Sequence, residues 1–382
     1  MTVGIVGVAE TAVGKRPEVS GLGLYAEAVI AAAADANLRL SELECVMTAN
    51  SRVTPYLYHA ETIAEYLGIE PRLCLTVGTG GSTSIALVHQ AQALIQAGAC
   101  RNAIVVAADN LATGLGTDRT VESMAGIGHP QLEAPYGVFI PALYALVAQR
   151  YLSYYSIDPA AVAEVAVADR MHAARNPAAQ YRTPLSVDDV LASKLISSPL
   201  HLLECSPVSD AGAAVVLGCE EVIESSGNRL VSVLGYGEAH PHEHLVQSGD
   251  LSRTGAEQSG KQAYHSAGLR PADVDVAYVY DAFGFIQCMQ LEDLGFCDRG
   301  EGAAFVQSGA TRPGGSLPTN TNGGVLSHSH AGKPSALLLL VEAVRQLRNQ
   351  CGDRQVPGAS TAIVHAEGGI LASHSTMLVG AR

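Results

Sequence analysis

The chain repeats part of its own pattern, and this internal similarity limits the possible folds more than any other feature. The segment VGIVGVAETA (3–12) resembles VSVLGYGEAH (231–240), and we align Gly7 with Gly237. Two more pairs follow in the same order, namely ANLRLSELECVMT (36–48) with AGLRPADVDVAYV (267–279), and CRNAIVVAADN (100–110) with ASTAIVHAEGG (359–369). The repetition predicts two halves of similar structure.

Each half alternates between strand-like and helix-like segments. The short runs AIVVAA and TAIVHA are rich in β-branched residues, which is typical of strands buried on both faces. The segments GLYAEAVIAAAADA and SALLLLVEAVRQLRNQ place apolar residues at helical spacing. Their alternation predicts an α/β protein of two mixed sheets with helices on both faces. We expect an N-terminal half at 1–225, with an inserted region at about 112–205, and a C-terminal half at 226–382.

Charge and cysteine usage exclude several classes of protein. The 37 acidic and 23 basic residues leave a formal net charge of −14, which disfavours nucleic acid as a partner. The eight cysteines are scattered without a CxxC pair, as in a reducing compartment. The start MTVGIVGV lacks the features of a signal peptide, and no apolar run reaches membrane-spanning length. We therefore expect a cytoplasmic protein without a membrane span.

Three histidines alternate in the segment HPHEH, at His240, His242 and His244. The pattern resembles a metal-binding cluster, but we find no further carboxylate or cysteine at ligand spacing. We therefore expect no bound metal, and we place these histidines in a solvated loop or at a partner interface.

A glycine-rich turn opens the apolar helix of TVGTGGSTSIALVHQAQALIQAG (76–98), and its centre is Gly80-Gly81 rather than a reactive residue. Ser82 and Thr83 follow the glycines. Serine and threonine are common at helix starts because their hydroxyls bond backbone N–H groups. We favour that structural role over a nucleophilic one.

The duplication matches this turn with GGVLSHSHAG (323–332), which carries His328 and His330 and precedes the apolar helix at 335–348. Two glycine-rich turns at helix N-termini would face one another across the axis that relates the halves. Their backbone N–H groups are then predicted to form an anion or oxyanion site.

The remaining motifs resemble the thiolase superfamily, and most closely its sterol-carrier-protein-type branch, which includes the steroid side-chain aldolases. The motifs that carry this resemblance are YDAF (280–283), LPTNTNGG (317–324), SHSHAG (327–332) and HAEGG (365–369). The resemblance covers essentially the whole chain. It implies the thiolase fold, with two βαβαβαββ halves in an α-β-α-β-α arrangement, a homodimer, and a coenzyme A thioester as substrate rather than a permanently bound cofactor.

The resemblance also assigns positions in the site. Gly81 stands where these thiolases have their reactive cysteine, and Thr83 stands at the family's serine. The second cysteine of the family is replaced by His365, and the histidine of its Gly-His-Pro turn matches His330. Tyr280 takes the place of the asparagine that helps to hold the thioester oxygen.

Without the cysteine, the resemblance points to retro-aldol cleavage of a β-hydroxyacyl-CoA by acid–base and oxyanion catalysis. We expect Tyr280 to handle the hydroxyl proton, while His330 and the Gly81 N–H hold the enolate oxygen. His365 is a third candidate catalytic residue. Glycine at position 81 is expected to leave an empty space for a bulky β-substituent. Further substrate or oxyanion contacts are expected from Ser82, Thr83 and His328.

Two other functions remain open. One is a thiolase or acyltransferase whose nucleophile comes from Ser82, from a neighbouring chain or from free coenzyme A. The other is a non-catalytic thiolase-like subunit of a complex. The steroid side-chain aldolases carry a second tyrosine where this chain has His330, and they work with a small OB-fold, zinc-ribbon subunit. The resemblance implies a similar partner here.

Overall fold

The computed structural model describes residues 2–381, except for the side chains of residues 117, 120, 121 and 123. Its strands are β1 (Val3–Glu10), β2 (Cys45–Ala49), β3 (Leu73–Val77), β4 (Asn102–Asn110), β5 (Leu195–Ser197), β6 (Leu200–His201), β7 (Asp210–Cys219), β8 (Val231–Ala239), β9 (Val276–Val279), β10 (Thr361–Gly368) and β11 (Ser373–Ala381). No helix within the described range is both long enough and apolar enough to span a membrane.

The helices lie between these strands in the chain, singly or in succession. They are α1 (Gly21–Asp35), α2 (His59–Leu67), α3 (Thr83–Gln96), α4 (Leu111–Gly114), α5 (Thr117–Ala125), α6 (Ile140–Tyr155), α7 (Pro159–Ala173), α8 (Val187–Ala192), α9 (Glu220–Ser226), α10 (Ala256–Ala267), α11 (Gly284–Asp293), α12 (Gly302–Gln307) and α13 (Ser335–Leu347). Two short turns are important for the site, the 3₁₀ turn η2 (Gly80–Ser82) and the π-helical turn η7 (Gly324–His328).

The long strands form one sheet in the order β3-β2-β4-β7-β1-β8-β11-β10-β9. The sequence predicted two mixed sheets, one in each half. The structure adds that they join at one residue pair, Ile5 with Val231, where β1 and β8 run antiparallel. The remaining strand pairs lie within one half or the other.

The strand order repeats outward from this junction, which confirms the predicted duplication. From the centre, β1-β7-β4-β2-β3 in one half corresponds to β8-β11-β10-β9 in the other. The edge position of β3 is taken in the second half by a short extended segment at Thr319, which bridges Ala277 in parallel. Two backbone bonds hold this segment, from Ala277 N to Pro318 O at 3.1 Å and from Asn320 N to Ala277 O at 2.9 Å.

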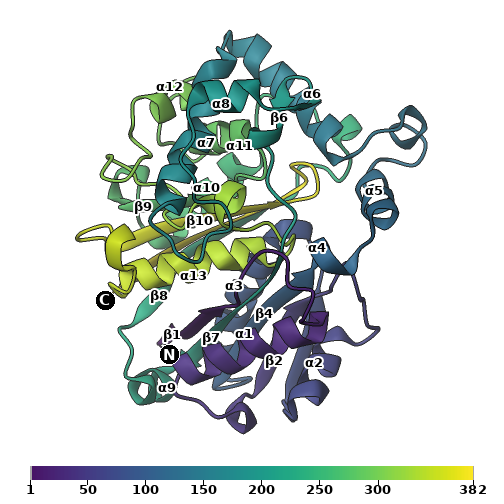
Figure 1. Cartoon of the computed structure of the whole chain (residues 1–382). Coiled ribbons are helices and arrows are strands. Elements are labelled where there is room, and N and C mark those ends of the chain that lie inside the picture. Colours follow the sequence, from purple (N-terminus) through teal and green to yellow (C-terminus); the bar gives the residue numbers. More distant parts are fainter. Residues whose placement is uncertain (1, 382) are drawn as a thin grey trace.

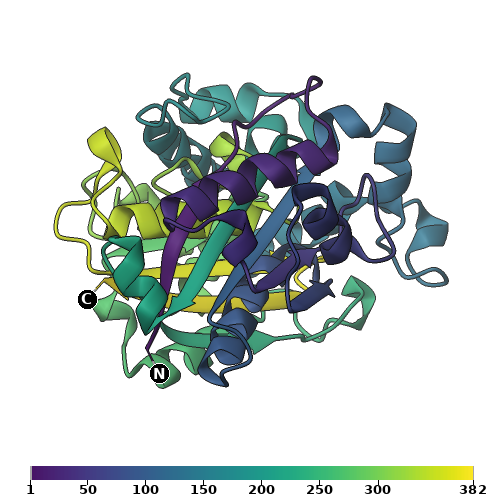
Figure 2. The ribbon, with the colours of Figure 1, turned by 90° about the horizontal axis from the view of Figure 1, so that it is seen from below.

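The elements stack in layers (Figure 1). Helices α3 and α13 lie between the strands of the two halves and contact strands of both. Helix α1 crosses the outer face of the N-terminal strands (Figure 2), and α10 covers the outer face of β8 and β11. Nearly every residue of α13 is buried, as expected of a helix enclosed on both sides.

Glycines in the central strands let the covering helices approach closely, and they correct the alignment made from the sequence. A Cβ at Gly7 would lie 2.2 Å from Ala32 O and 2.7 Å from Ala36 Cβ. The same contacts recur at Gly235, whose Cβ would lie 2.3 Å from Ala263 O. A Cβ at Gly235 would also lie 2.8 Å from Ala267 Cβ, and Ala267 aligns with Ala36 in the repeat, so Gly7 corresponds to Gly235 rather than to Gly237. Since side chains two residues apart share one face of a strand, the sequence pattern fits either choice.

Helices α4 to α8 and the β5–β6 hairpin lie between β4 and β7 in the chain. They gather on the side of the C-terminal half and extend over the junction, in blue and teal (Figure 1). This segment corresponds to the region that the sequence predicts as an insertion at about 112–205. The boundaries of the two halves themselves remain a prediction.

Substitution of Gly235 by alanine is expected to lower the free energy of unfolding by roughly 1–3 kcal/mol, because the new methyl group overlaps the backbone of α10. Equilibrium denaturation in urea measures the change. Gly249→Ala is the matched control, because its Cβ would find no atom within 4 Å. Equal stability of the two variants would contradict the close strand–helix contact.

Candidate active site

A cavity of about 1030 Å³ opens where the two halves and the inserted helices meet. Both glycine-rich turns line it, the first through residues 78–81 and the second through His330, Gly332 and Lys333. Its apolar wall comes from α4 to α6 and their connections, through Leu111, Leu115, Met124, Ile127, Ile140 and Pro141. The predicted meeting of the two turns is therefore present.

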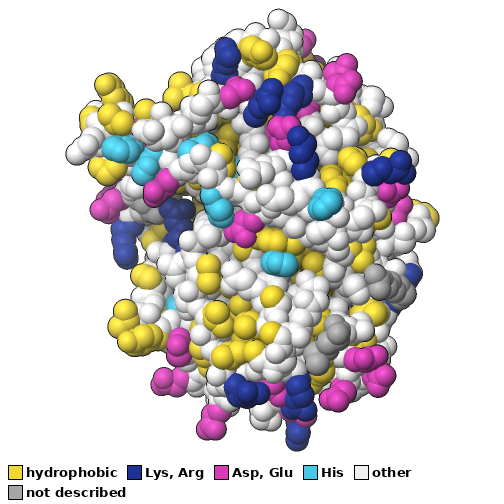
Figure 3. Space-filling model, turned by 180° about the vertical axis from the view of Figure 1, so that it is seen from behind, with side chains coloured by type: hydrophobic (Ala, Val, Ile, Leu, Met, Phe, Trp, Pro, Cys, Tyr) yellow, Lys and Arg dark blue, Asp and Glu magenta, His cyan; other side chains and the backbone are white. Residues whose placement is uncertain are grey.

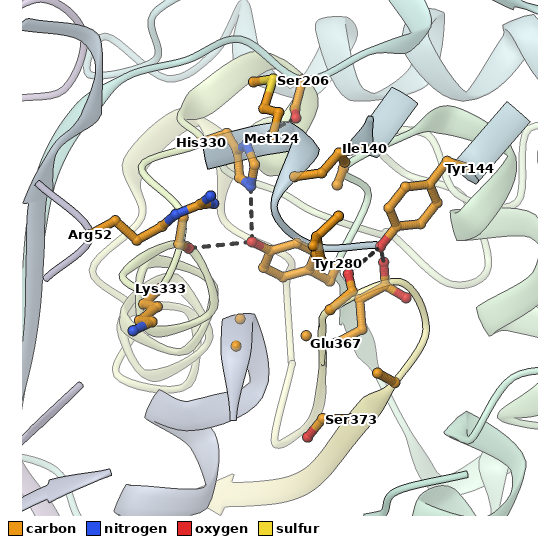
Figure 4. A pocket seen from close by; sticks show the side chains of 18 of the residues that line it. Arg52, Met124, Ile140, Tyr144, Ser206, Tyr280, His330, Lys333, Glu367 and Ser373 are labelled. Atoms are coloured by element: carbon orange, nitrogen blue, oxygen red, sulfur yellow. Dashed lines mark hydrogen bonds between the residues drawn. The ribbon is translucent and has the colours of Figure 1, made fainter. Parts of the chain in front are cut away.

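Tyr280 and His330 form a hydrogen-bonded pair at the base of this cavity (Figure 4). Tyr280 directly follows β9, and His330 follows the π-helical turn η7. The Tyr280 hydroxyl lies 3.0 Å from His330 Nε2 and 3.3 Å from the carbonyl oxygen of Gly332. The rings meet edge to face, with centroids 5.9 Å apart.

The segment before β7 holds the histidine in place. His330 Nδ1 lies 3.1 Å from Ser206 Oγ, and the His330 backbone N–H donates to Ser209 Oγ at 3.2 Å. Ser209 in turn donates to Gln180 Oε1 at 2.6 Å. When Nδ1 carries the proton and donates it to Ser206, Nε2 is free to accept the Tyr280 hydroxyl proton.

Burial keeps both rings of the pair neutral. It lowers the pKa of His330 to about 4, and the positive charge of Arg52 acts in the same direction. It raises the pKa of Tyr280 well above that of a free phenol. Near neutral pH the pair is therefore an uncharged phenol beside an uncharged imidazole.

The position of Gly81 corrects one expectation. The sequence predicted an empty space where thiolases have a cysteine, but a Cβ at Gly81 would lie 2.3 Å from the carbonyl oxygen of Glu367. The same Cβ would lie 3.1 Å from the Tyr280 hydroxyl. The backbone of β10 and the phenol of Tyr280 therefore occupy this region, and glycine is required to let them approach.

Ser82 and Thr83 are fully buried and serve the structure of the turn. The Ser82 hydroxyl donates to Thr79 O at 2.8 Å and lies 2.7 Å from Ser373 Oγ. The Thr83 hydroxyl donates to Gly80 O at 2.6 Å and accepts from the Thr79 N–H at 2.8 Å. Neither residue lines the cavity.

The other two histidine candidates lie outside the cavity lining. His328, the last residue of η7, has its Nε2 at 3.0 Å from Glu10 Oε2. His365 is fully buried, with its two ring nitrogens 2.8 Å from Thr376 Oγ1 and 3.3 Å from His374 Nδ1. On the same face of β10, two residues further along, Glu367 is the side chain that reaches the cavity.

Glu367 is therefore a site residue that the sequence analysis missed. Tyr144 donates its hydroxyl proton to Glu367 Oε1 at 2.8 Å, and Gln290 Nε2 donates to Oε2 at 3.3 Å. Burial raises the pKa of Glu367 to about 8, although both hydrogen bonds act against the rise. A carboxyl group inside the apolar strand that ends in HAEGG was the available signal.

Basic side chains lie at the rim of the cavity. Arg52 and Lys333 line one side, where burial lowers the pKa of Lys333 to about 8. Figure 3 shows histidine side chains gathered at the upper left of the view. His240, His242 and His244 line the cavity.

These three histidines point to different partners. His240 Nε2 lies 3.0 Å from Glu238 Oε1, and His242 Nε2 lies 3.0 Å from Ile370 O. The His244 ring lies against that of His129, with centroids 4.9 Å apart. Within residues 2–381 no group of three or more histidine, cysteine or acidic side chains converges as metal ligands would.

Comparison with known proteins agrees with the geometry. Residues 237–381 match the family described as Thiolase C-terminal domain-like. The chain is 33% identical to a steroid side-chain-cleaving aldolase of Thermomonospora curvata, over 91% of this chain and 92% of the relative. It is 29% identical to an acetyl-CoA acetyltransferase of Methanothermobacter thermautotrophicus over 96% of both chains. Among solved structures, the Ltp2-ChsH2(DUF35) aldolase superposes with a TM-score of 0.88 at 30% identity, over 99% of this chain and 97% of that one.

The fold and site define a thiolase-like enzyme of the aldolase or acyltransferase type. The chain belongs to the thiolase superfamily, in the sterol carrier protein 2-like branch near the steroid side-chain aldolases. The relatives support carbon–carbon cleavage or acyl transfer on coenzyme A thioesters. The resemblance inferred from the sequence and the thiolase fold are both confirmed.

Gly81→Ala is expected to lower stability by roughly 1–3 kcal/mol and to reduce activity, because its methyl group would displace Glu367 O or Tyr280. Denaturation and steady-state kinetics measure the two effects. Gly126→Ala is a control at the cavity wall, where the nearest atom to the added Cβ lies at 3.4 Å. A Gly81→Ala protein as stable and as active as wild type would contradict the close packing.

The Glu10–His328 pair predicts how stability depends on acidity. Burial alone would raise the pKa of Glu10, but His328 and Arg345 lower it from 4.5 to about 2. A lowered pKa stabilises the fold above pH 4.5, and this contribution is lost as the pH falls towards about 2. Glu10→Gln should therefore lose less unfolding free energy than wild type over this range, by about 1–3 kcal/mol. Identical pH dependence in urea denaturation would contradict the pair.

Proposed function

We propose that this protein cleaves a β-hydroxyacyl-CoA by a retro-aldol reaction that forms no covalent enzyme intermediate. The observation that carries the proposal is the 3.0 Å contact between the Tyr280 hydroxyl and His330 Nε2. This pair lies in a cavity where Gly81 stands in place of a nucleophile. An acid–base pair without a thiolate suits proton transfer better than acyl transfer.

In the first step, Tyr280 removes the proton of the substrate β-hydroxyl as its own proton passes to His330 Nε2. The low pKa of His330 keeps this nitrogen unprotonated near neutral pH. Ser206 supports the imidazole from the other side. As the hydroxyl oxygen becomes a carbonyl, the carbon–carbon bond breaks and its electron pair moves into the thioester group.

The second requirement is to stabilise the enolate oxygen that results. The turn η2 and helix α3 begin at the cavity, so backbone N–H groups at Gly80 and Gly81 lie at a helix N-terminus. The helix dipole favours negative charge there. One well-placed donor of this kind is typically worth about 3–4 kcal/mol.

The acyl group is proposed to be large and apolar. The cavity measures about 1030 Å³, and α4 to α6 line it with aliphatic side chains. Such a pocket suits a substrate of drug-like size or larger. The steroid side-chain-cleaving aldolase among the relatives supports a substrate that resembles a steroid side chain.

The active assembly is proposed to be a homodimer with a small OB-fold, zinc-ribbon partner subunit. The solved structure of the Ltp2-ChsH2(DUF35) aldolase supports this partner, because that aldolase consists of two named components, Ltp2 and ChsH2. Acyl transfer through Ser82 is the alternative reaction. Its hydroxyl already bonds Thr79 O and Ser373 and has no imidazole among these partners.

The proposal is tested by incubating the purified protein, together with any subunit that co-purifies, with a panel of β-hydroxyacyl-CoA thioesters. We expect release of an aldehyde or ketone and a shortened acyl-CoA without added free coenzyme A. Tyr280→Phe and His330→Gln should each lower kcat by about 10²–10⁴-fold. Tyr278→Phe is the matched control. The Tyr278 hydroxyl lies 2.8 Å from Thr321 Oγ1, and Tyr278 does not line the cavity.

The alternatives give different results in the same assay. A requirement for free coenzyme A, or an acylated Ser82 peptide in mass spectrometry, would establish acyl transfer instead. Full activity of both the Tyr280 and His330 variants in the assembled complex would indicate a non-catalytic subunit.

A further inference from the structure

The carboxyl group of Glu367 has no part in the chemistry described so far. It lies at the end of β10, only 1% exposed, and it lines the cavity beside Tyr280 (Figure 4). The pair of Tyr280 and His330 and the N–H groups of the glycine turn account for the hydroxyl and the thioester oxygen. A third group at the same cavity floor needs a separate explanation.

Two elements outside β10 hold this carboxyl group in position. Tyr144 on α6 donates to Oε1 at 2.8 Å, and it also donates to the carbonyl oxygen of Gly369 at 3.2 Å. Gln290 on α11 donates to Oε2 at 3.3 Å and to the carbonyl oxygen of Tyr280 at 3.2 Å. Gln290 therefore joins the carboxyl group to the strand end that carries the catalytic phenol.

The reaction itself demands a second proton transfer. Cleavage leaves an enolate on the shortened acyl-CoA, and its α-carbon must gain a proton before the product is released. The pair of Tyr280 and His330 has by then taken up the hydroxyl proton and lies beside the new carbonyl group. A separate acid at the cavity floor would protonate the enolate before Tyr280 and His330 return to their starting protonation states.

This inference rests on the proposed function. We propose that Glu367 is the acid that protonates the α-carbon of the enolate, and the base that removes the same proton in the reverse direction. In the forward step the O–H bond of Glu367 breaks, and the enolate electron pair forms the new Cα–H bond. The thioester carbonyl is restored, and Glu367 remains as a carboxylate. Solvent returns a proton to Glu367, and His330 releases the hydroxyl proton to solvent, so no proton is gained or lost overall.

The environment of Glu367 suits both directions. Burial raises its pKa to about 8, so the acid form predominates near neutral pH and the base form becomes available just above it. Tyr144 and Gln290 both lower the pKa of Glu367 through their hydrogen bonds, so they limit the rise. The chemistry at the α-carbon then depends on pH independently of His330, whose pKa is lowered to about 4.

Exchange of α-protons in deuterated water tests this role separately from cleavage. Wild-type protein, with any subunit that co-purifies, is incubated with propionyl-CoA or acetyl-CoA and followed by mass spectrometry. We expect deuterium to enter the α-position, at a rate that rises with pH through about 8. Glu367→Gln should slow this exchange at least about 100-fold. Tyr280→Phe should change the exchange rate by less than about tenfold, although it lowers kcat for cleavage by about 10²–10⁴-fold.

A second buried pair supplies the control. Glu292 accepts a hydrogen bond from Tyr151, as Glu367 does from Tyr144, but it does not line the cavity. Glu292→Gln should exchange at the wild-type rate. Tyr144→Phe removes a hydrogen bond that lowers the pKa of Glu367, so its exchange profile should move to higher pH. A purely structural role for the Tyr144–Glu367 bond would not move this profile.

The outcomes separate the two proposals. Exchange that persists in a folded Glu367→Gln protein would overturn the role of Glu367, whatever the cleavage assay shows. Cleavage by wild-type protein without any exchange would overturn it as well. Exchange that depends on Glu367, in a protein that cleaves no β-hydroxyacyl-CoA, would refute the retro-aldol function and leave the role of Glu367 at the α-carbon intact.

Discussion

The site depends on one backbone contact between the two halves of the molecule. The glycine turn before α3 lies against the end of β10 so closely that a Cβ at Gly81 would be 2.3 Å from Glu367 O. In the opposite direction, a Cβ at Gly368 would be 2.3 Å from Thr79 O. Only glycine on both sides permits this approach. It brings the start of α3 beside the phenol of Tyr280 and closes the floor of the cavity.

The duplicated fold explains why the functional groups meet at this point. Helices α3 and α13 lie together between the strands of the two halves, and each is preceded by a turn that lines the cavity. Loops and helix starts positioned by such a rigid scaffold are where function commonly resides. The segment between β4 and β7 completes the site by supplying Ser206 beside His330 and Tyr144 beside Glu367.

The three central side chains share one electrostatic property. Burial lowers the pKa of His330, raises the pKa of Tyr280 and raises the pKa of Glu367. Near neutral pH all three are therefore uncharged in an apolar cavity, where a fixed charge would be costly. On these three groups, charge then appears only as protons move during the reaction, close to groups already placed to receive it. This arrangement favours proton transfer and enolate chemistry over attack by an anionic nucleophile.

The sequence alone determined the duplicated α/β architecture, the thiolase-type relationship and the two turns that carry Gly81 and His330. Periodicity and motifs are local properties, so they can be read without coordinates. The tertiary structure decided the rest. Close packing of helices on strands matched Gly7 with Gly235 as equivalent positions of the two halves, and the order of side chains along β10 directed Glu367 into the cavity and placed His365 in a buried contact with His374. It also filled the expected space beside Gly81 with a carbonyl group, because distances between segments far apart in the chain depend on how whole layers pack.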